Sequence, residues 1–149
     1  MDLEKRLSQK MIKKSAISLI SYDAHLLPRS IERYYDYVDE IVLGLDKDRI
    51  TWSNNPFSFE EGKLWDSLNK IDKESKISII EENFHKSDIA IENDNYERNF
   101  LKDQCSNEMI VSVDADEILL DPKSFFIDFI PLTERYFHNY DICMTWATP

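Results

Sequence analysis

The chain contains few glycines, few cysteines and no long apolar run. Only two of its 149 residues are glycine, which argues against a linker-rich or low-complexity protein. The two cysteines, Cys105 and Cys143, lack the spacing of a metal motif, so we expect reduced thiols in a cytoplasmic protein. No apolar stretch approaches the roughly 20 residues of a membrane span, and no leader of signal-peptide type opens the chain. We therefore predict no transmembrane segment.

Positive charge is also scarce. The 18 lysines and arginines are outnumbered by 29 aspartates and glutamates, which leaves a formal net charge of −11. A surface that neutralises many phosphates is incompatible with this balance, so we expect no nucleic-acid partner. A small anionic ligand is compatible with it where a divalent cation lies between ligand and protein. The hydrophobic content of 42% and the length predict one folded domain over residues 1–149.

Apolar runs alternate with amphipathic segments along the chain. SAISLISY (15–22) has no polar alternation beyond serine, which is typical of a strand covered on both faces, and HLLPRSIERYYDYV (25–38) has its apolar residues at helical spacing. This alternation predicts an α/β protein, a three-layer α/β/α sandwich with a mainly parallel sheet. After a lead-in over 1–14, the expected strands are 15–22, 39–46, 76–83, 109–113 and 142–149, and the expected helical segments are 25–38, 60–72, 93–108 with Asn93 or Asp94 as its N-cap, and 121–141 broken by Pro131.

Three carboxylates follow the fourth expected strand, in the stretch VSVDADEIL (111–119). Ligands of open parallel sheets collect at the carboxyl ends of the strands, which makes Asp114 and Asp116 candidates for a site. Residues two apart in an extended segment point the same way, so these two side chains are expected to address one point in space. Their hard oxygens suit Mg²⁺ or Mn²⁺. A D-x-D pattern also fits a solvated loop or the N-cap of a following helix, and this alternative stays open.

Two other acidic motifs fit the stretch less well. An EF-hand loop requires a glycine at its sixth position and a glutamate at its twelfth, and both are missing. A phosphatase with Asp114 as nucleophile and Asp116 as acid is expected to carry the motif on its first strand, whereas here it follows three strands.

Two longer segments resemble the metal-dependent nucleotide-sugar glycosyltransferases of the GT-A fold, especially family 2. SAISLISYDAHLLPRSIERYYDYVDEIVLGLD is similar to the opening strand, helix and second strand of that family and ends at Asp46. YERNFLKDQCSNEMIVSVDADE is similar to its Arg-Asn helix and acidic motif, with Arg98 and Asn99 in the paired positions and Asp114 sixteen positions after Arg98. The resemblance covers nearly all of the chain.

The resemblance implies a sugar transfer from a nucleotide diphosphate donor to a hydroxyl acceptor on a glycan, lipid or protein, with an inverting outcome by analogy. It implies Mn²⁺ or Mg²⁺ bound by Asp116 and by Asp114 through ribose or water, where the cation would act as Lewis acid on the pyrophosphate. It also implies a donor pocket in which Asp46 binds the base and Arg98 the phosphates. A surface Arg98 paired with Asp94 or Asp103, and a turn role for Asp46, are the alternatives, and they stay open. The implied donor-binding residues are Ser21, Tyr22, Asp46, Arg98, Asn99 and Asp114.

The chain departs from the resembled pattern at three places. The loop DKDRITWSN (46–54) has no glycine, and His25 stands where the family often has Asn-Glu. In the family the acceptor pocket and the carboxylate that deprotonates the acceptor lie further on, so the resemblance implies a donor-binding half whose general base lies beyond residue 149. Two other classes compete: a binding or interaction domain without turnover, and a nucleotidyltransferase, which is disfavoured because SYDAHLL (21–27) has no Gly-rich phosphate loop.

Overall fold

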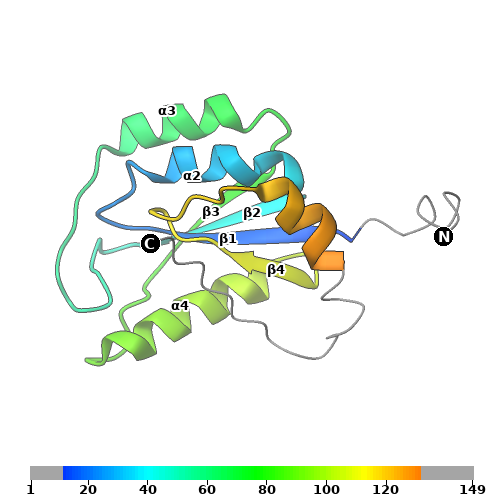
Figure 1. Ribbon diagram of the computed structural model, residues 1–149. Coiled ribbons are helices and arrows are strands. Elements are labelled where there is room, and N and C mark those ends of the chain that lie inside the picture. Colours follow the sequence, from blue (N-terminus) through cyan, green and yellow to red (C-terminus); the bar gives the residue numbers. More distant parts are fainter. Residues whose placement is uncertain (1–11, 132–149) are drawn as a thin grey trace, which may run out of the picture.

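A computed structural model describes residues 12–131 and contains one four-stranded sheet in the order β3-β2-β1-β4, with every pair of neighbours parallel (Figure 1). The predictions of an α/β class and a parallel sheet are confirmed. The strands are β1 (Lys14–Ile20), β2 (Glu40–Asp46), β3 (Ile77–Glu82) and β4 (Met109–Ser112); the helices are α2 (Leu27–Tyr34), η1 (Tyr35–Tyr37), α3 (Glu61–Ile71), α4 (Ala90–Gln104) and η2 (Ser124–Phe129), a π-helical segment.

Helices cover both faces of the sheet. Figure 1 shows α2 and α3 on one face and α4 on the other. Successive residues of a strand point to opposite faces, so Ala16 and Ile20 of β1 join a core cluster with α2 and α3, whereas Ile17 and Leu19 join a second cluster with Leu101 of α4. Burial on both sides explains why the interior of β2 is an uninterrupted apolar run and why β1, after Lys14, is interrupted only by Ser15 and Ser18.

Gly44 lets α4 approach the middle of β2. A Cβ at this position would lie 2.7 Å from Oε1 of Glu97 and 2.7 Å from Cδ1 of Leu101, which is closer than real carbon contacts allow. The missing side chain therefore fixes how near the helix lies to the sheet, and it places Glu97 directly against the strand backbone.

The expected start of α4 was wrong. The helix begins at Ala90 with Ile89 as its N-cap residue, and neither Asn93 nor Asp94 caps it. Asn93 is instead fully buried in the first turn, where its Oδ1 accepts hydrogen bonds from the backbone N–H groups of Lys86 and Ser87, both at 2.8 Å. Its amide N–H group donates to the carbonyl oxygen of Trp52 at 2.9 Å. The Asn93 side chain therefore links the segment with Lys86 and Ser87 to the loop with Trp52. These bonds require a position inside the helix and not at its N-cap.

Other boundaries shift by a few residues. The helix expected over 25–38 divides into α2 and the 3-10 segment η1. Strand β1 begins at Lys14, within the expected lead-in; the Lys14 ammonium reaches the carbonyl oxygen of Ile12 at 2.9 Å while its stem is buried. The strand expected over 142–149, Cys143 and the whole segment beyond Pro131 lie outside the described residues. In the described part, none of the helices is both long and apolar enough to cross a bilayer.

Candidate functional site

The candidate site lies where β2 and β4 end. Asp46 is the last residue of β2 and Asp114 lies two residues after the end of β4, and the parallel sheet brings these strand ends to the same edge. Helix α4 runs between β3 and β4 in the sequence and packs on β2 and β1, so Arg98 in its middle reaches the residues that follow β4. The structure therefore joins two segments that the sequence separates by sixteen positions.

Arg98 is the centre of an ion-pair cluster. Its Nη1 and Nη2 atoms donate to Oδ1 and Oδ2 of Asp114 at 2.9 and 3.1 Å, its Nε donates to Asp94 at 2.5 Å, and Nη1 also reaches the Ser112 hydroxyl at 2.6 Å. Burial alone would lower the pKa of Arg98, but the hydrogen bonds and charges of Asp114 and Asp94 outweigh it and raise that pKa further. The guanidinium is permanently charged and held in a two-pronged geometry that suits carboxylate or phosphate oxygens.

The segment after Asp114 is a turn, not an extended strand. The Glu117 N–H donates to the carbonyl oxygen of Asp114 at 3.0 Å, and the Glu117 carboxylate accepts from the Asp114 N–H at 2.9 Å. Arg33 of α2 then holds the next stretch through the carbonyl oxygens of Leu119 and Leu120, at 3.1 and 2.7 Å. Strand alternation therefore does not orient Asp116, and the geometric argument from D-x-D spacing was wrong. The Glu117 carboxylate stabilises the backbone of this turn.

Three carboxylates still gather near this turn. Burial raises the pKa of Asp23, an N–H of its own backbone lowers it, and the negative charges of Asp116 and Asp114 raise it again. Asp23, which follows β1, was not among the residues predicted from the sequence; its only signal was its place after the first strand. Asp116 is exposed and makes no ion pair within residues 12–131. The mutual repulsion marks a place where a cation would lower the electrostatic energy.

These residues fit a divalent ion that takes few protein ligands. Mg²⁺ and Mn²⁺ are commonly bound through one or two carboxylates, with phosphate oxygens and water completing the shell. Within the described residues no group of three or more His, Cys, Asp or Glu side chains is arranged to hold a metal ion. Asp116 and Asp23 have oxygens available, whereas both oxygens of Asp114 are bonded to Arg98. The donor set fits a cation shared with a ligand better than a structural metal.

Asp46 occupies a different environment from the one predicted. Only 5% of the residue is exposed, and its carboxylate accepts three backbone N–H groups: Asp48 at 3.0 Å, Ile50 at 3.1 Å and Phe84 at 2.8 Å. These bonds close the loop after β2 and tie it to the segment after β3. A carboxylate used in this way has a structural role. Both of its oxygens already accept hydrogen bonds, so neither is left to accept one from a nucleobase as predicted.

The remaining predicted donor residues do not converge with Arg98. Tyr22 is 71% exposed, so it is not part of the core. The carbonyl oxygen of Ser21 accepts the Ala24 N–H at 3.1 Å in the turn that leads to α2. Asn99 lies on the exposed side of α4, although the neighbouring Arg98 points to the end of β4. Of the expected donor set, the structure brings together Arg98 and Asp114.

Comparisons with family models, curated proteins and solved structures return no match for this chain. The likeness to GT-A glycosyltransferases therefore rests on the residues quoted above, and membership of that family is not shown. Any function has to come from the geometry of the site itself.

A buried acid lies beside the ion-pair cluster and was missed from the sequence. Glu97, one residue before Arg98, is 5% exposed and accepts the indole N–H of Trp52 at 2.7 Å. The Arg98 guanidinium lies 5.6 Å from the centre of the same indole ring. The available signal was helical spacing, because Glu97 falls four residues after Asn93 and four before Leu101, and all three face the sheet.

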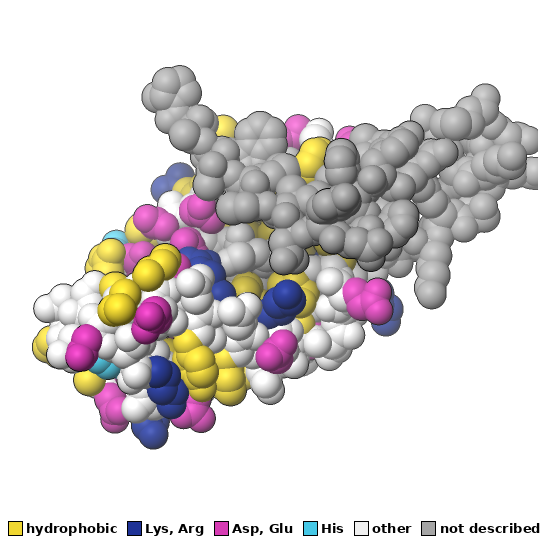
Figure 2. Space-filling view, turned by 90° about the horizontal axis from the view of Figure 1, so that it is seen from below, with side chains coloured by type: hydrophobic (Ala, Val, Ile, Leu, Met, Phe, Trp, Pro, Cys, Tyr) yellow, Lys and Arg dark blue, Asp and Glu magenta, His cyan; other side chains and the backbone are white. Residues whose placement is uncertain are grey.

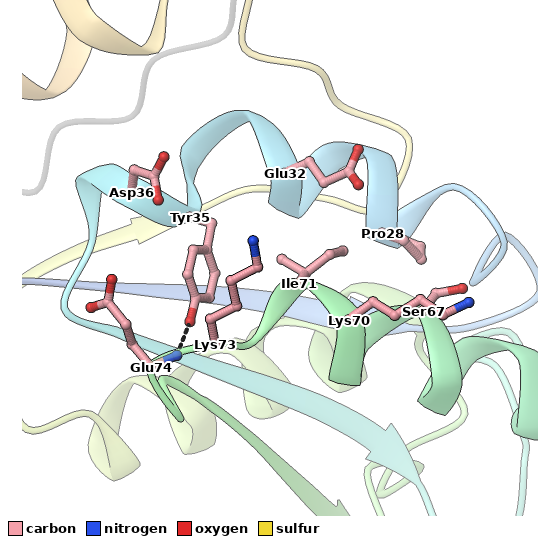
Figure 3. Close-up of a pocket in the computed structure, with 9 residues that line it drawn as sticks. All are labelled: Pro28, Glu32, Tyr35, Asp36, Ser67, Lys70, Ile71, Lys73 and Glu74. Atoms are coloured by element: carbon pink, nitrogen blue, oxygen red, sulfur yellow. Dashed lines mark hydrogen bonds between the residues drawn. The ribbon is translucent and has the colours of Figure 1, made fainter.

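A groove between α2 and α3 is a less suitable candidate. It has a volume of about 410 Å³, and Figure 3 shows acidic side chains of Glu32 and Asp36 above lysines 70 and 73. Its central polar group is already paired, since the Tyr35 hydroxyl accepts the Glu74 N–H at 2.9 Å and donates to Asp72 at 2.8 Å. Tyr35 and Glu74 precede β2 and β3, so this part of the groove lies toward the amino ends of the strands, where parallel sheets seldom bind ligands.

The face that carries α4 shows acidic, basic and hydrophobic side chains interspersed (Figure 2). In its described part no extended basic surface is visible, in agreement with the net charge of −11. Such a surface gives no support to a polyanion partner.

Proposed function

We propose that this chain binds a nucleotide diphosphate sugar together with Mn²⁺ or Mg²⁺ and belongs to a glycosyltransferase of GT-A type. The observation that carries the proposal is the bidentate pair of Arg98 and Asp114 at the carboxyl end of a parallel sheet. It unites the two motif residues on which the resemblance depends. The expected partners are the sugar donor and a hydroxyl acceptor on a glycan, lipid or protein, in the cytoplasm.

Within this proposal the side chains have separate tasks. Asp116, exposed and without an ion pair among the described residues, would hold the cation, with Asp23 nearby. The cation supplies charge neutralisation that makes the diphosphate a better leaving group. Arg98 would exchange its two bonds to Asp114 for bonds to phosphate oxygens, because its fork geometry matches either partner. That exchange would release the Asp114 carboxylate toward the cation or the ribose.

The catalytic base lies outside these residues in this proposal. Of the described acids near Arg98 and Asp114, Asp116 and Asp23 are assigned to the cation, and the most strongly perturbed one, Glu97, is buried against β2. We therefore assign donor binding, and not the complete transfer, to the described part of the chain.

The test is calorimetric titration of UDP and then GDP into the protein, with Mn²⁺ and with a chelator. We expect binding that requires the metal and that falls at least about tenfold in Asp116→Ala, equivalent to about 1.4 kcal/mol. Asp66→Ala is the matched control, because Asp66 is an exposed aspartate in the middle of α3 and its removal changes the net charge equally. That variant should bind as the wild type does.

A non-catalytic binding or interaction domain is the second candidate. It is favoured by the commitment of Asp46 to three backbone N–H groups and of Asp114 to Arg98, which leaves neither acid ready for a donor. If a folded sample binds neither nucleotide with either metal, this second candidate replaces the first. Binding that survives in Asp116→Ala would also contradict the metal assignment.

A further inference from the structure

Glu97 is a buried carboxyl group with one hydrogen-bond donor among the described residues. Its Oε2 accepts the Trp52 indole N–H at 2.7 Å. Its Oε1 lies 2.7 Å from the position that a Cβ on Gly44 would occupy, close to the β2 backbone, and it has no hydrogen bond to a described residue. A buried carboxylate normally needs several donors or a paired cation, and an acid with one donor is better accommodated in its neutral form.

The charges around Glu97 act in the same direction on balance. Asp46 at the end of β2 and Asp94 on the same helix are negative, and Arg98 is the opposing positive charge. Arg98 is itself bonded to Asp94 and Asp114, so its charge is largely compensated. Burial raises the pKa of Glu97 to about 7; the Trp52 hydrogen bond and Arg98 lower it, and Asp46 and Asp94 raise it.

Trp52 connects this acid to the loop between β2 and α3, residues 47–60. The indole N–H of Trp52 donates to Glu97, and the backbone carbonyl oxygen of Trp52 accepts a side-chain N–H of Asn93 at 2.9 Å. The loop carries Asn54 in the left-handed backbone region, at φ 62°, and few of its side chains are buried. Other bonds and packing anchor the two ends of this loop, so it is the tip around Trp52, residues 51–55, that depends on Glu97 and Asn93.

We propose that Glu97 is a proton-controlled latch: the neutral acid holds the indole of Trp52, and the carboxylate leaves its pocket and releases the tip of the loop, residues 51–55. The driving force is the cost of an ionised group against the β2 backbone and beside Asp46, which solvation outside the pocket removes. The same event frees the ring beneath Arg98, so the latch couples pH to the position of the Arg98 guanidinium. The inference does not depend on the proposed sugar donor.

The direct test follows the indole N–H resonance of Trp52 by ¹⁵N NMR between pH 5 and pH 9, with Trp52→Phe to assign it. We expect the resonance to titrate with a midpoint well above the ordinary glutamate value and no higher than about 7, because burial raises the pKa of Glu97 and departure from the pocket relieves part of that effect. Trp65 is the internal control, since its ring packs on Phe59 at 6.0 Å and has no contact with Glu97. A Trp52 midpoint near the ordinary glutamate value of about 4.3 would overturn the latch.

Release of the loop tip is measured by amide hydrogen exchange of peptides covering residues 51–55, compared at equal pH between wild type and Glu97→Gln. The substituted glutamine side chain keeps the shape and can still accept the indole N–H, but it cannot ionise. At pH 6 the two proteins should exchange alike, and at pH 8 the wild-type loop should exchange several-fold faster. Equal rates at pH 8 would show that the carboxylate stays in place, which also overturns the proposal.

A stability measurement gives an independent check on the sign. Because the folded pKa is raised above the unfolded value, the stabilising proton is fully bound below about pH 4 and is lost as pH rises through 7. The urea midpoint of the wild type should therefore fall relative to Glu97→Gln between these limits. If Glu97→Gln proves unfolded, the wild-type indole titration still decides, because it needs no variant at position 97.

Discussion

Asp46 and Asp114 follow two strands of the same parallel sheet, yet they have opposite environments. Asp46 is 5% exposed and accepts three backbone N–H groups, whereas the Asp114 side chain is 39% exposed and pairs with one arginine. Both were expected to bind the donor. The difference shows that position at the carboxyl end of a strand is not sufficient to make a ligand group; what matters is how many neighbouring backbone donors the carboxylate already satisfies.

The contrast separates a structural acid from an exchangeable one. Three backbone N–H groups around Asp46 would remain without acceptors if the carboxylate turned to a ligand, and buried donors without acceptors are costly. Asp114 can lose Arg98 to a phosphate while Arg98 keeps Asp94, so the exchange leaves no buried group unpaired. Substitutions at these positions therefore test whether the two acids have different roles.

The largest effect is expected for Asp46→Ala. Loss of the acceptor for Ile50 and Phe84 should destabilise the protein by about 3 kcal/mol, because the donors become buried without partners. Urea unfolding monitored by circular dichroism measures this, and Asp48→Ala is the control: Asp48 is exposed on the same loop and should change stability by less than about 0.5 kcal/mol. A cost below about 1 kcal/mol for Asp46→Ala, together with lost nucleotide binding, would restore Asp46 as a ligand residue.

A smaller effect is expected for Gly44→Ala. The added methyl group would lie 2.7 Å from the side-chain tips of Glu97 and Leu101, which are buried and must shift, so we expect a destabilisation of about 2 kcal/mol. Gly62→Ala is the matched substitution, because a Cβ there meets nothing within 4 Å and α3 should gain up to about 1 kcal/mol from helix propensity. If both variants shift the thermal midpoint in the same direction, the close approach of α4 at Gly44 is contradicted.

The smallest effect on stability is expected for Asp114→Asn. The pair with Arg98 is partly exposed, so its loss should cost on the order of 0.5 kcal/mol and less at high salt. Chemical unfolding at low and at high ionic strength measures the difference. A cost as large as that of Asp46→Ala would mean that Asp114 is structural too, and the comparison between the two acids would fail.

The sequence predicted features that depend on the residues of a single helix or strand. Apolar runs such as EIVLGLD predicted a strand covered on both faces, and the observed β2 is buried along nearly its whole length. The resemblance placed Arg98 and Asp114 in one donor site, and the two side chains do meet, at 2.9 and 3.1 Å. The alternative of an Arg98–Asp94 pair also forms, at 2.5 Å. The start of α4 could not be predicted in this way, because Asn93 is used by backbone groups of two loops outside the helix.

The sequence by itself determined the alternation of strands and helices, the parallel sheet and the acidic edge after β4, because periodicity and the position of charges are local properties. Only the tertiary structure decided which acid is available. The Asp46 carboxylate accepts backbone N–H groups from two loops, and the Asp114 carboxylate binds an arginine from α4. Glu97 fits against β2 because Gly44 has no side chain. Each of these roles depends on contacts between segments that are far apart in the chain, and the pattern of neighbouring residues does not predict such contacts.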